Sequence, residues 1–422
     1  MTNPRERTHG REGALVIGGD YKSLGVVRSL GRRGIPVWVL NDDHVLAGWS
    51  RFCQRVAGWP MATEEAQVAF LLELARDNDL DGWTIFPAGE EPAALVARNR
   101  SALEERYRLS ILSSWETLEH AYDKRLTYRL AAKLGVDHPL TRYPRDRAEV
   151  AAFDGPFPAI LKPAIRPTLD RFTMDKAWPV MDLASLVARY DEACSVSDAA
   201  AIMIQEVIPG GGETQFSYAA LCRAGEPIAS VTARRTRQWP MDFGRASTFV
   251  ETIDAPDVEE TARRVLLALA FDGIVEIEFK RDPRDGALKL LDINPRVWGW
   301  HTLGRRAGVD FPYLLWRTVH GEPVTPVRGR SGVGWVRALT DVPVAIAAIR
   351  DGRLSPAAYV RSLRAPIEFA VLAADDPLPA LVEVPVSALL AWRRRDAMRS
   401  AGRQGAPRPL RTASPAIHGR LE

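Results

Sequence analysis

Two neighbouring polar segments place carboxylate, amide and amine side chains at intervals that suit chemistry. In "GIVEIEFKRD", Glu276, Glu278 and Lys280 alternate with apolar residues. In "LLDINPR", Asp292 and Asn294 alternate in the same way. Alternate residues of a strand share one face, and the Asp-Gly pair in the short connection is typical of a hairpin. The two polar faces are therefore predicted to lie side by side.

Carboxylates gathered so closely repel one another unless a cation lies between them. Oxygen ligands without His or Cys are those that Mg²⁺ or Mn²⁺ prefers. Pro295 also biases Asn294 toward extended backbone, which would hold its amide on the ligand face. The hairpin thus predicts a candidate metal site. A solvated antiparallel strand with alternating polar residues is the alternative, and the hairpin alone favours it.

Basic residues elsewhere have the chemistry to meet anionic ligands. Lys162 lies inside the buried-type strand "FPAILKPA", where a phosphate would satisfy it; a lysine reaching solvent from a strand end is the alternative. Lys124 and Lys176 are uninformative individually. Arg235 and Arg237, in "TARRTRQWPMDFGRAST", are candidate clamps because guanidinium pairs bidentately with carboxylate. A basic surface loop is the alternative there.

Two glycine-rich turns follow apolar strands. In "IQEVIPGGGETQF", the break between Glu206 and Glu213 exposes backbone groups that suit the edge of a flat heterocycle, and a carboxylate that suits ribose hydroxyls. An ordinary turn between strands is the alternative. "GGDYKSLG" lacks the spacing of a dinucleotide fingerprint. A small anionic ligand at the helix start that follows is still a reasonable expectation.

The elements that must position these residues fall into successive regions. Strand, glycine turn, helix and strand over 14–42 indicate a βαβ unit. We predict that residues 1–118 form a small parallel α/β domain of Rossmann-like type. From 119 to 325 the order of elements indicates α+β layers. Residues 326–395 are predicted to be an accessory region, and 396–422 a disordered basic tail.

Composition excludes several classes of protein. The hydrophobic content of 46% and the charged content of 26% are ordinary for a globular chain. Three scattered Cys and seven His give neither a disulfide framework nor a zinc motif. We expect a cytoplasmic protein without a membrane span, because no apolar run reaches about 18 residues. Residues 393–422 carry a net charge of +6 in a chain of +3, and we expect a solvated tail rather than nucleic-acid or membrane binding.

Taken in chain order, these features resemble the ATP-grasp superfamily, and within it ATP-dependent carboxylate–amine ligases similar to D-aspartate ligase. The matching pieces are Lys124, "ILKPA", "QEVIPGGGE", "EIEFKRD" and "LLDINPR". The resemblance implies an ATP-grasp domain over 119–325, with a lid subdomain at about 155–205 and a large subdomain at about 206–325. The N-terminal region would be the Rossmann-like domain that precedes it.

The resemblance also implies a role for each matched residue. It implies ATP-binding residues at Lys124, Lys162, Lys176, Glu206, Val207, Ile208 and Glu213. It implies Mg²⁺ (or Mn²⁺) ligands at Glu278, Asp292 and Asn294, with Arg296 facing the transferred phosphoryl group; whether Glu276 also binds metal stays open. The sequence departs from the family at Asp292, where Glu is more usual, and at 164–176, a phosphate-covering loop without glycine.

The implied reaction joins a carboxylate to an amine through an acyl phosphate. We expect small-molecule substrates, amino acids above all, and leave a homodimer open. Three alternatives remain from the residues. They are another ATP-dependent transfer on the same fold (a kinase or a carboxylase-type enzyme), an NAD-linked oxidoreductase, and a non-catalytic nucleotide-binding regulator.

Overall fold

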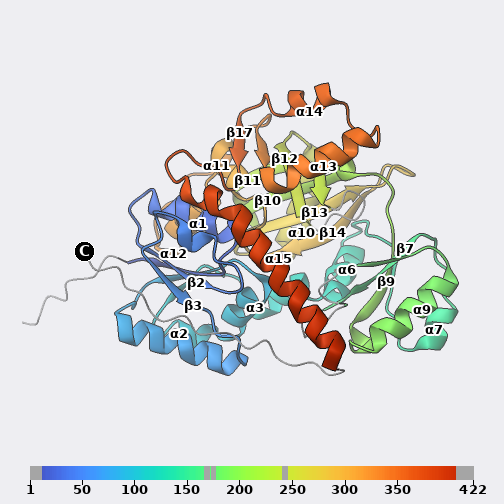
Figure 1. The fold of residues 1–422 in the computed structure, drawn as a ribbon, viewed down its shortest axis with the longest axis horizontal. Helices are drawn as coiled ribbons and strands as arrows, with labels where there is room; N and C mark the ends of the chain where they lie inside the picture. The colour runs from blue at the N-terminus through green and yellow to red at the C-terminus, as the bar shows by residue number, and fades with distance from the viewer. Residues whose placement is uncertain (1–11, 166–171, 173–176, 240–245, 405–422) are drawn as a thin grey trace, which may run out of the picture. The chain divides into compact units, whose positions relative to one another are not determined.

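The computed structural model describes residues 12–165, 172, 177–239 and 246–404, and the chain divides into two compact units (Figure 1). The first unit holds Met1–Ser114, Arg296–Val327 and Glu368–Glu422. The second holds Trp115–Pro295 and Arg328–Ile367. The sequence predicts domains that follow one another along the chain, with a boundary between residues 325 and 326. The two units of the structure instead interleave, because segments 296–327 and 368–422 belong with the N-terminal residues.

Parallel strands form the sheet of the first unit, in the order β3-β2-β1-β4-β5. The strands are β1 (Ala14–Ile17), β2 (Val37–Asn41), β3 (Arg55–Gly58), β4 (Thr84–Pro87) and β5 (Arg108–Leu109). All residues of β1 and β4 are buried, as expected for strands covered on both faces. The predicted parallel α/β architecture is confirmed.

Helices flank this sheet, and Figure 1 shows α1 and α2 on opposite sides of β2 and β3. The helical segments of the unit are α1 (Tyr21–Gly31), η1 (Ala47–Trp49), α2 (Glu64–Asn78), α3 (Glu90–Arg98), α4 (Arg100–Leu103), α11 (Thr302–Ala307), α12 (Phe311–Val319) and α15 (Leu378–Gln404). The helix α12 packs against α1, which explains why the segment after Pro295 belongs with the N-terminal residues.

The Gly-Gly-Asp turn before α1 has a structural explanation. A Cβ on Gly19 would lie 1.8 Å from the His44 carbonyl oxygen, so that only glycine fits. The Asp20 carboxylate caps α1 by accepting hydrogen bonds from the N–H groups of Lys22 (2.9 Å) and Ser23 (3.2 Å). Asp20 thus already accepts from two of the N–H groups at the helix start where a small anionic ligand was expected.

A buried carboxylate anchors the C-terminal segment to α1. Asp376 accepts hydrogen bonds from Nε of Arg28 at 2.9 Å and from the N–H of Arg51 at 2.9 Å. The charged side chains of Arg28 and Asp376 are both buried. An ion pair in this setting makes the segment before α15 an integral part of the first unit.

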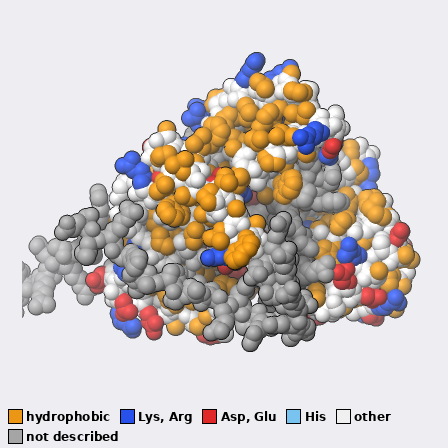
Figure 2. Space-filling model, in the orientation of Figure 1, with side chains coloured by type: hydrophobic (Ala, Val, Ile, Leu, Met, Phe, Trp, Pro, Cys, Tyr) orange, Lys and Arg blue, Asp and Glu red, His pale blue; other side chains and the backbone are white. Residues whose placement is uncertain are grey.

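The helix α15 begins at Leu378 and continues to Gln404. Residues 396–404 of the tail that was expected to be disordered are thus drawn as helix, while 405–422 lie outside the described residues. Figure 2 shows hydrophobic side chains on the face where the N-terminal half of α15 lies. None of the helices described here has the length and apolar character that crossing a bilayer needs.

The larger sheet of the second unit has the order β14-β13-β10-β11-β12-β16-β17, with β15 beside β11. Its strands are β10 (Gln215–Arg223), β11 (Glu226–Trp239), β12 (Ala246–Thr252), β13 (Gly273–Arg281), β14 (Leu288–Asn294), β15 (Val327–Arg328), β16 (Gly334–Val336) and β17 (Ile367–Phe369). The associated helices are α5 (Trp115–Tyr122), α6 (Lys124–Lys133), α10 (Pro256–Ala268), α13 (Ala338–Arg350) and α14 (Pro356–Ser362). Part of the predicted accessory region thus completes this sheet.

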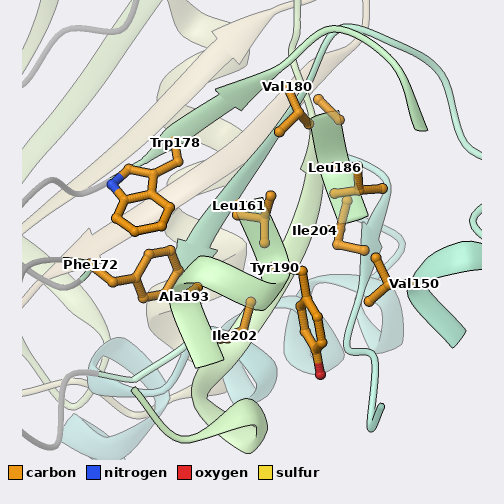
Figure 3. Packing of buried hydrophobic residues seen from close by; sticks show 11 residues of the cluster. Val150, Leu161, Phe172, Trp178, Val180, Leu186, Tyr190, Ala193, Ile202 and Ile204 are labelled. Carbon is orange, nitrogen blue, oxygen red and sulfur yellow. The ribbon is translucent and has the colours of Figure 1, made fainter. Parts of the chain in front are cut away.

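A smaller antiparallel sheet in the same unit has the order β6-β9-β7-β8. It comprises β6 (Thr141–Arg142), β7 (Ala159–Pro163), β8 (Trp178–Val180) and β9 (Ile202–Glu206), with α7 (Arg147–Ala151), α9 (Leu183–Cys194) and the short turns η2 (Ala199–Ala201) and η3 (Gly212–Thr214). Figure 3 shows its core, where Phe172 packs edge-on against Trp178 with ring centroids 5.0 Å apart. This core holds β7 and β9, which carry Lys162 and Glu206.

We predict that Asp376→Ala lowers the free energy of unfolding by about 3 kcal/mol, because it leaves the Arg28 guanidinium buried without its carboxylate. Asp375→Ala is the matched control, because its ion pair with Arg32 is more exposed and should contribute less than about 1 kcal/mol. Urea unfolding followed by circular dichroism measures both. Equal losses would show that the buried pair does not anchor the segment.

Candidate functional site

The β13–β14 hairpin brings the predicted carboxylates together. Glu278 lies directly opposite Asp292, and Glu276 lies opposite Asn294. This register confirms that the two polar faces lie side by side.

A bulge after Glu278 then pairs Phe279 with Leu290, so that Leu290 is fully buried and Leu291 only partly. Simple alternation in the sequence would instead place Leu291 in the core, because it does not reveal the extra residue.

Each of the two facing carboxylates has its own cationic partner. Asp292 forms an ion pair with Nζ of Lys124, and Glu278 forms one with Nη1 of Arg235. The side chains of Lys124 and Arg235 are largely buried. Two opposed like charges are thus compensated by two cations that come from other elements, α6 and β11.

The amide of Asn294 joins the neighbouring carboxylates. Its Nδ2 donates to Oε1 of Glu278 at 3.1 Å and to Oε2 of Glu276 at 3.3 Å. Glu276 and Asn294 are both buried. The arrangement gathers carboxylate and amide side chains, whose oxygens are the ligand type that Mg²⁺ or Mn²⁺ prefers, and here the amide nitrogen faces the carboxylates. The described residues contain no group of three or more His, Cys, Asp and Glu arranged for a metal ion, and the predicted set of two carboxylates and an amide is not of that kind.

Lys124 is placed by the start of α6. Asp123 caps this helix, and the N–H of Lys124 donates to the carbonyl of Ala164 at the end of β7. Further along α6, the Tyr128 hydroxyl donates to the Leu291 carbonyl at 3.0 Å. These bonds tie α6 to both sheets. Lys162 lies half-buried on β7, close in sequence to the Ala164 contact.

Gly210 to Gly212, which we call the glycine hinge, pack against β11, the strand that carries Arg235. A Cβ on Gly212 would lie 2.3 Å from the Arg235 carbonyl oxygen, so that the third glycine permits this approach. Glu213 accepts from the N–H of Gly211 at 2.9 Å. Nζ of Lys280 donates to the Gly210 carbonyl at 2.7 Å, and burial lowers the pKa of this lysine. The hinge is therefore connected to β13 two residues beyond Glu278.

Glu206 belongs to a second charged cluster, formed with Asp282, Arg284 and Lys289. The Glu206 carboxylate accepts from the N–H of Leu140 (2.9 Å), from Arg284 (2.7 Å) and from Lys289 (2.9 Å). Burial acts to raise the pKa of Glu206, but these hydrogen bonds outweigh it and the pKa is lowered.

Asp282, which is fully buried, binds the same two cations. The hydrogen bond from Arg284, opposed by burial and reinforced by Lys289, lowers the pKa of Asp282. The cluster fixes the end of β9 to the hairpin turn. The Glu206 carboxylate is thus held by three donors of the chain, and its predicted role in binding the adenine edge stays a prediction.

The other predicted nucleotide residues follow β9. The N–H of Val207 donates to the Pro158 carbonyl at 3.2 Å, and Ile208 is buried. Lys176 lies outside the described residues, as does most of the 164–176 loop.

The two candidate clamps differ in their partners. Arg237 is buried and binds both carboxylate oxygens of Asp341, at 2.8 and 2.9 Å. Phe249 lies under its guanidinium, 4.2 Å away. Both arginines already pair with a carboxylate of the chain, but Asp341 is fully buried, whereas the Glu278 side chain is 18% exposed, so that Arg235 is the better candidate for a substrate.

Arg296 lies in the first unit, where its Nη2 donates to Oε1 of Glu90 at 2.6 Å. Sequence reasoning missed the cluster of Asp282, Arg284 and Lys289. The available signal was the charge density of "RDPRDGALK", whose Asp-Gly pair by itself indicates only a hairpin connection.

The comparisons with known proteins agree with this architecture. Residues 198–341 match the family model described as "ATP-grasp in the biosynthetic pathway with Ter operon". No curated protein sequence matches the chain.

Several solved structures resemble the fold. The L-amino acid ligase from Bacillus licheniformis is 16% identical with a TM-score of 0.58, and the match covers 74% of each chain. The biotin carboxylase domain of the Hydrogenobacter thermophilus 2-oxoglutarate carboxylase, crystallised with MgADP, ADP and bicarbonate, is 14% identical with a TM-score of 0.60, over 77% of this chain and 74% of that one. The N5-carboxyaminoimidazole ribonucleotide synthetase from Thermus thermophilus is 18% identical with a TM-score of 0.54, over 75% and 81%. The predicted ATP-grasp resemblance is confirmed.

We predict that Lys289→Met lowers the free energy of unfolding by about 2 kcal/mol near neutral pH, because two buried carboxylates lose a shared cation. The lowered pKa of Asp282 contributes stability above its unfolded value, about 3.9, and that stability is lost as the pH falls through the folded value. The difference between variant and wild type should therefore shrink below about pH 4. Thermal unfolding from pH 3 to 8 measures it, with exposed Lys133→Met as the control. A difference independent of pH would contradict the electrostatic origin.

Proposed function

We propose that this chain, which has the ATP-grasp fold, is an ATP-dependent ligase that joins a carboxylate to an amine through an acyl phosphate. ADP and phosphate would be released. The match to the ATP-grasp family model and the similarity to an amino acid ligase support this class of reaction. The fold alone does not select the substrates, so that the proposal depends on the chemistry of the site.

The pair of salt bridges on the hairpin is the observation that carries the proposal. Lys124 neutralises Asp292, and Arg235 neutralises Glu278. A metal ion would take over the neutralisation of both carboxylates. Lys124 and Arg235 would then turn to anionic groups of ATP and of the carboxylate substrate, which otherwise repel each other.

The residues present fit a divalent cation. Glu278, Asp292 and Asn294 would hold Mg²⁺ (or Mn²⁺), and the buried Glu276 beside Asn294 is available to orient the amide. Bound there, the ion supplies charge neutralisation at the nucleotide phosphates.

The nucleotide would lie along the hinge and three lysines. Lys124, Lys162 and Lys176 would bind phosphates. Backbone groups of Glu206, Val207 and Ile208 would bind the adenine edge, and Glu213 the ribose hydroxyls. The hydrogen bond from Lys280 to the Gly210 carbonyl holds the hinge in place. Less conformational entropy would therefore be lost when the nucleotide binds.

The chemistry consists of two transfers. A carboxylate oxygen attacks the γ-phosphorus, the bond to the β–γ bridging oxygen breaks, and ADP leaves. The amine nitrogen then attacks the acyl carbon, loses a proton, and the carbon–oxygen bond to phosphate breaks. Arg235 would hold the substrate carboxylate, and Arg296 would face the transferred phosphoryl group. We propose amino acids as the substrate class.

A carboxylase-type reaction is the second candidate, and a specific similarity favours it. The biotin carboxylase domain with bicarbonate has a TM-score of 0.60 to this chain. Bicarbonate can take the place of the organic carboxylate in the first transfer, which would give a carboxyphosphate. The two reactions are separated by whether turnover depends on bicarbonate or on an added organic carboxylate.

We predict that phosphate release from Mg²⁺-ATP requires both a carboxylate and an amine, and that Asn294→Ala lowers kcat at least about 100-fold by removing an oxygen donor for the metal. Amino acids tested singly and in pairs, with and without bicarbonate, provide the measurement. Asn78→Ala, on the surface of the first unit, is the matched control.

Release that depends on bicarbonate would support the carboxylase-type alternative, and release with a carboxylate alone a kinase-like one. ATP binding without release in any mixture would support a regulator.

We predict that Arg235→Gln raises the KM for the carboxylate at least about tenfold, and that it lowers the free energy of unfolding less than Arg237→Gln does, because Glu278 is partly exposed. Arg237→Gln should instead lower the free energy of unfolding by about 3 kcal/mol, since it strands the buried Asp341. Steady-state kinetics and urea unfolding of both variants measure this difference. If Arg237→Gln were the one that shifted KM without a stability loss, the assignment of the clamp would be reversed.

A further inference from the structure

A buried hydroxyl on the large sheet of the second unit forms no hydrogen bond. Ser217 on β10 is fully buried, and its Oγ has no hydrogen-bond partner among the described residues. Buried polar groups are nearly always hydrogen-bonded, because a hydroxyl that leaves water without gaining a partner destabilises the fold. The stability of the fold therefore does not explain a serine at this position.

The strand register places Ser217 on the face of the sheet that carries the candidate metal site. Ser217 lies directly opposite Glu278 on β13, and opposed residues of an antiparallel pair project from the same face. Glu278 in turn lies opposite Asp292 on β14. The hydroxyl thus shares a face with the carboxylates of the hairpin.

The ion pair between Arg235 and Glu278 passes over the strand that carries Ser217. In the sheet, β10 lies between β11, which carries Arg235, and β13, which carries Glu278 (Figure 1). The ion pair therefore crosses β10, and its side chains are only 7% and 18% exposed. On β11 the residue opposite Ser217 is Ala233, whose methyl group cannot bond to the hydroxyl. Ser217 is thus covered by charged groups that leave its hydroxyl unbonded.

We propose that Ser217 binds the carboxylate substrate, with its hydroxyl donating a hydrogen bond to one carboxylate oxygen while Arg235 pairs with the same group. This inference rests on the proposed function, in which a metal ion takes over Glu278 and Arg235 turns to the substrate. That exchange would uncover Ser217 and bring it a charged acceptor, to which hydrogen bonds are strong.

A hydroxyl suits this position better than a charged side chain would. It donates to an anion without adding a charge beside Glu278. A lysine or arginine there would compete with the metal ion for that carboxylate, and a further carboxylate would repel the substrate. The neutral donor therefore adds recognition of the substrate without disturbing the metal site.

The experiment compares Ser217→Ala with the wild type in the phosphate-release assay, with the carboxylate (bicarbonate included), the amine, ATP and Mg²⁺ varied in turn. The expected result is a KM for the carboxylate raised at least about tenfold, because a hydrogen bond to a charged group is lost. The KM values for ATP and the amine should change less than about twofold. Ser230→Ala is the matched control, because Ser230 is also buried but lies opposite Ala220, on the other face of the sheet, and it should leave every KM unchanged.

Urea unfolding provides a measurement that does not depend on turnover. Because the Ser217 hydroxyl has no partner in the fold, Ser217→Ala should leave the urea midpoint unchanged or raise it. A lowered midpoint would show that the hydroxyl stabilises the fold, and would overturn the inference.

The kinetic outcomes separate this inference from the proposed function. If the wild type turns over with a carboxylate and Ser217→Ala leaves the KM for that carboxylate unchanged, the inference alone is overturned. The same holds if the variant raises only the Mg²⁺ requirement, since Ser217 would then serve the metal site. A wild-type chain that releases no phosphate with any carboxylate or with bicarbonate would overturn the proposed function, and this inference with it.

Discussion

Two carboxylates that face each other across a hairpin impose the main constraint on the second unit. Glu278 and Asp292 occupy opposite positions of neighbouring strands, where like charges destabilise a sheet unless they are neutralised. The neutralising cations are Arg235 on β11, which β10 separates from β13, and Lys124 at the start of α6. Each of those elements must be held accurately. The helix cap at Asp123, the Tyr128 hydrogen bond and the glycine hinge all serve that placement.

Under the proposed function, the same arrangement would keep a site for anions stable when no anion is bound. A cluster of unpaired cations would repel itself, and unpaired carboxylates would do the same. When each cation pairs with a carboxylate, as Lys124 does with Asp292 and Arg235 with Glu278, the charges of both groups are neutralised. The cluster of Glu206, Asp282, Arg284 and Lys289 applies the same principle next to the hinge, where buried charges are fully bonded.

The sequence was sufficient to predict the features of this site that depend on residues close together in the chain. The alternation in "VEIEF" and "LLDIN" and the intervening Asp-Gly were sufficient for the hairpin and its polar face. The bulge that places Leu290 in the core was not predictable, because it depends on the pairing of two strands. The partner of Arg237 is Asp341, far along the chain, and alternation carries no information about such contacts. The packing of the residues after Pro295 with the N-terminal unit was not predictable either, because it also depends on contacts between distant parts of the chain.

A crystal structure with Mg²⁺ and ADP would test the central claim most directly. The proposed function predicts an ion at about 2.0–2.2 Å from oxygens of Asp292 and Glu278, with Nζ of Lys124 moved from Asp292 to a phosphate oxygen. A nucleotide bound elsewhere, or bound on the hinge while Lys124 still pairs with Asp292 and no ion lies between the carboxylates, would contradict it.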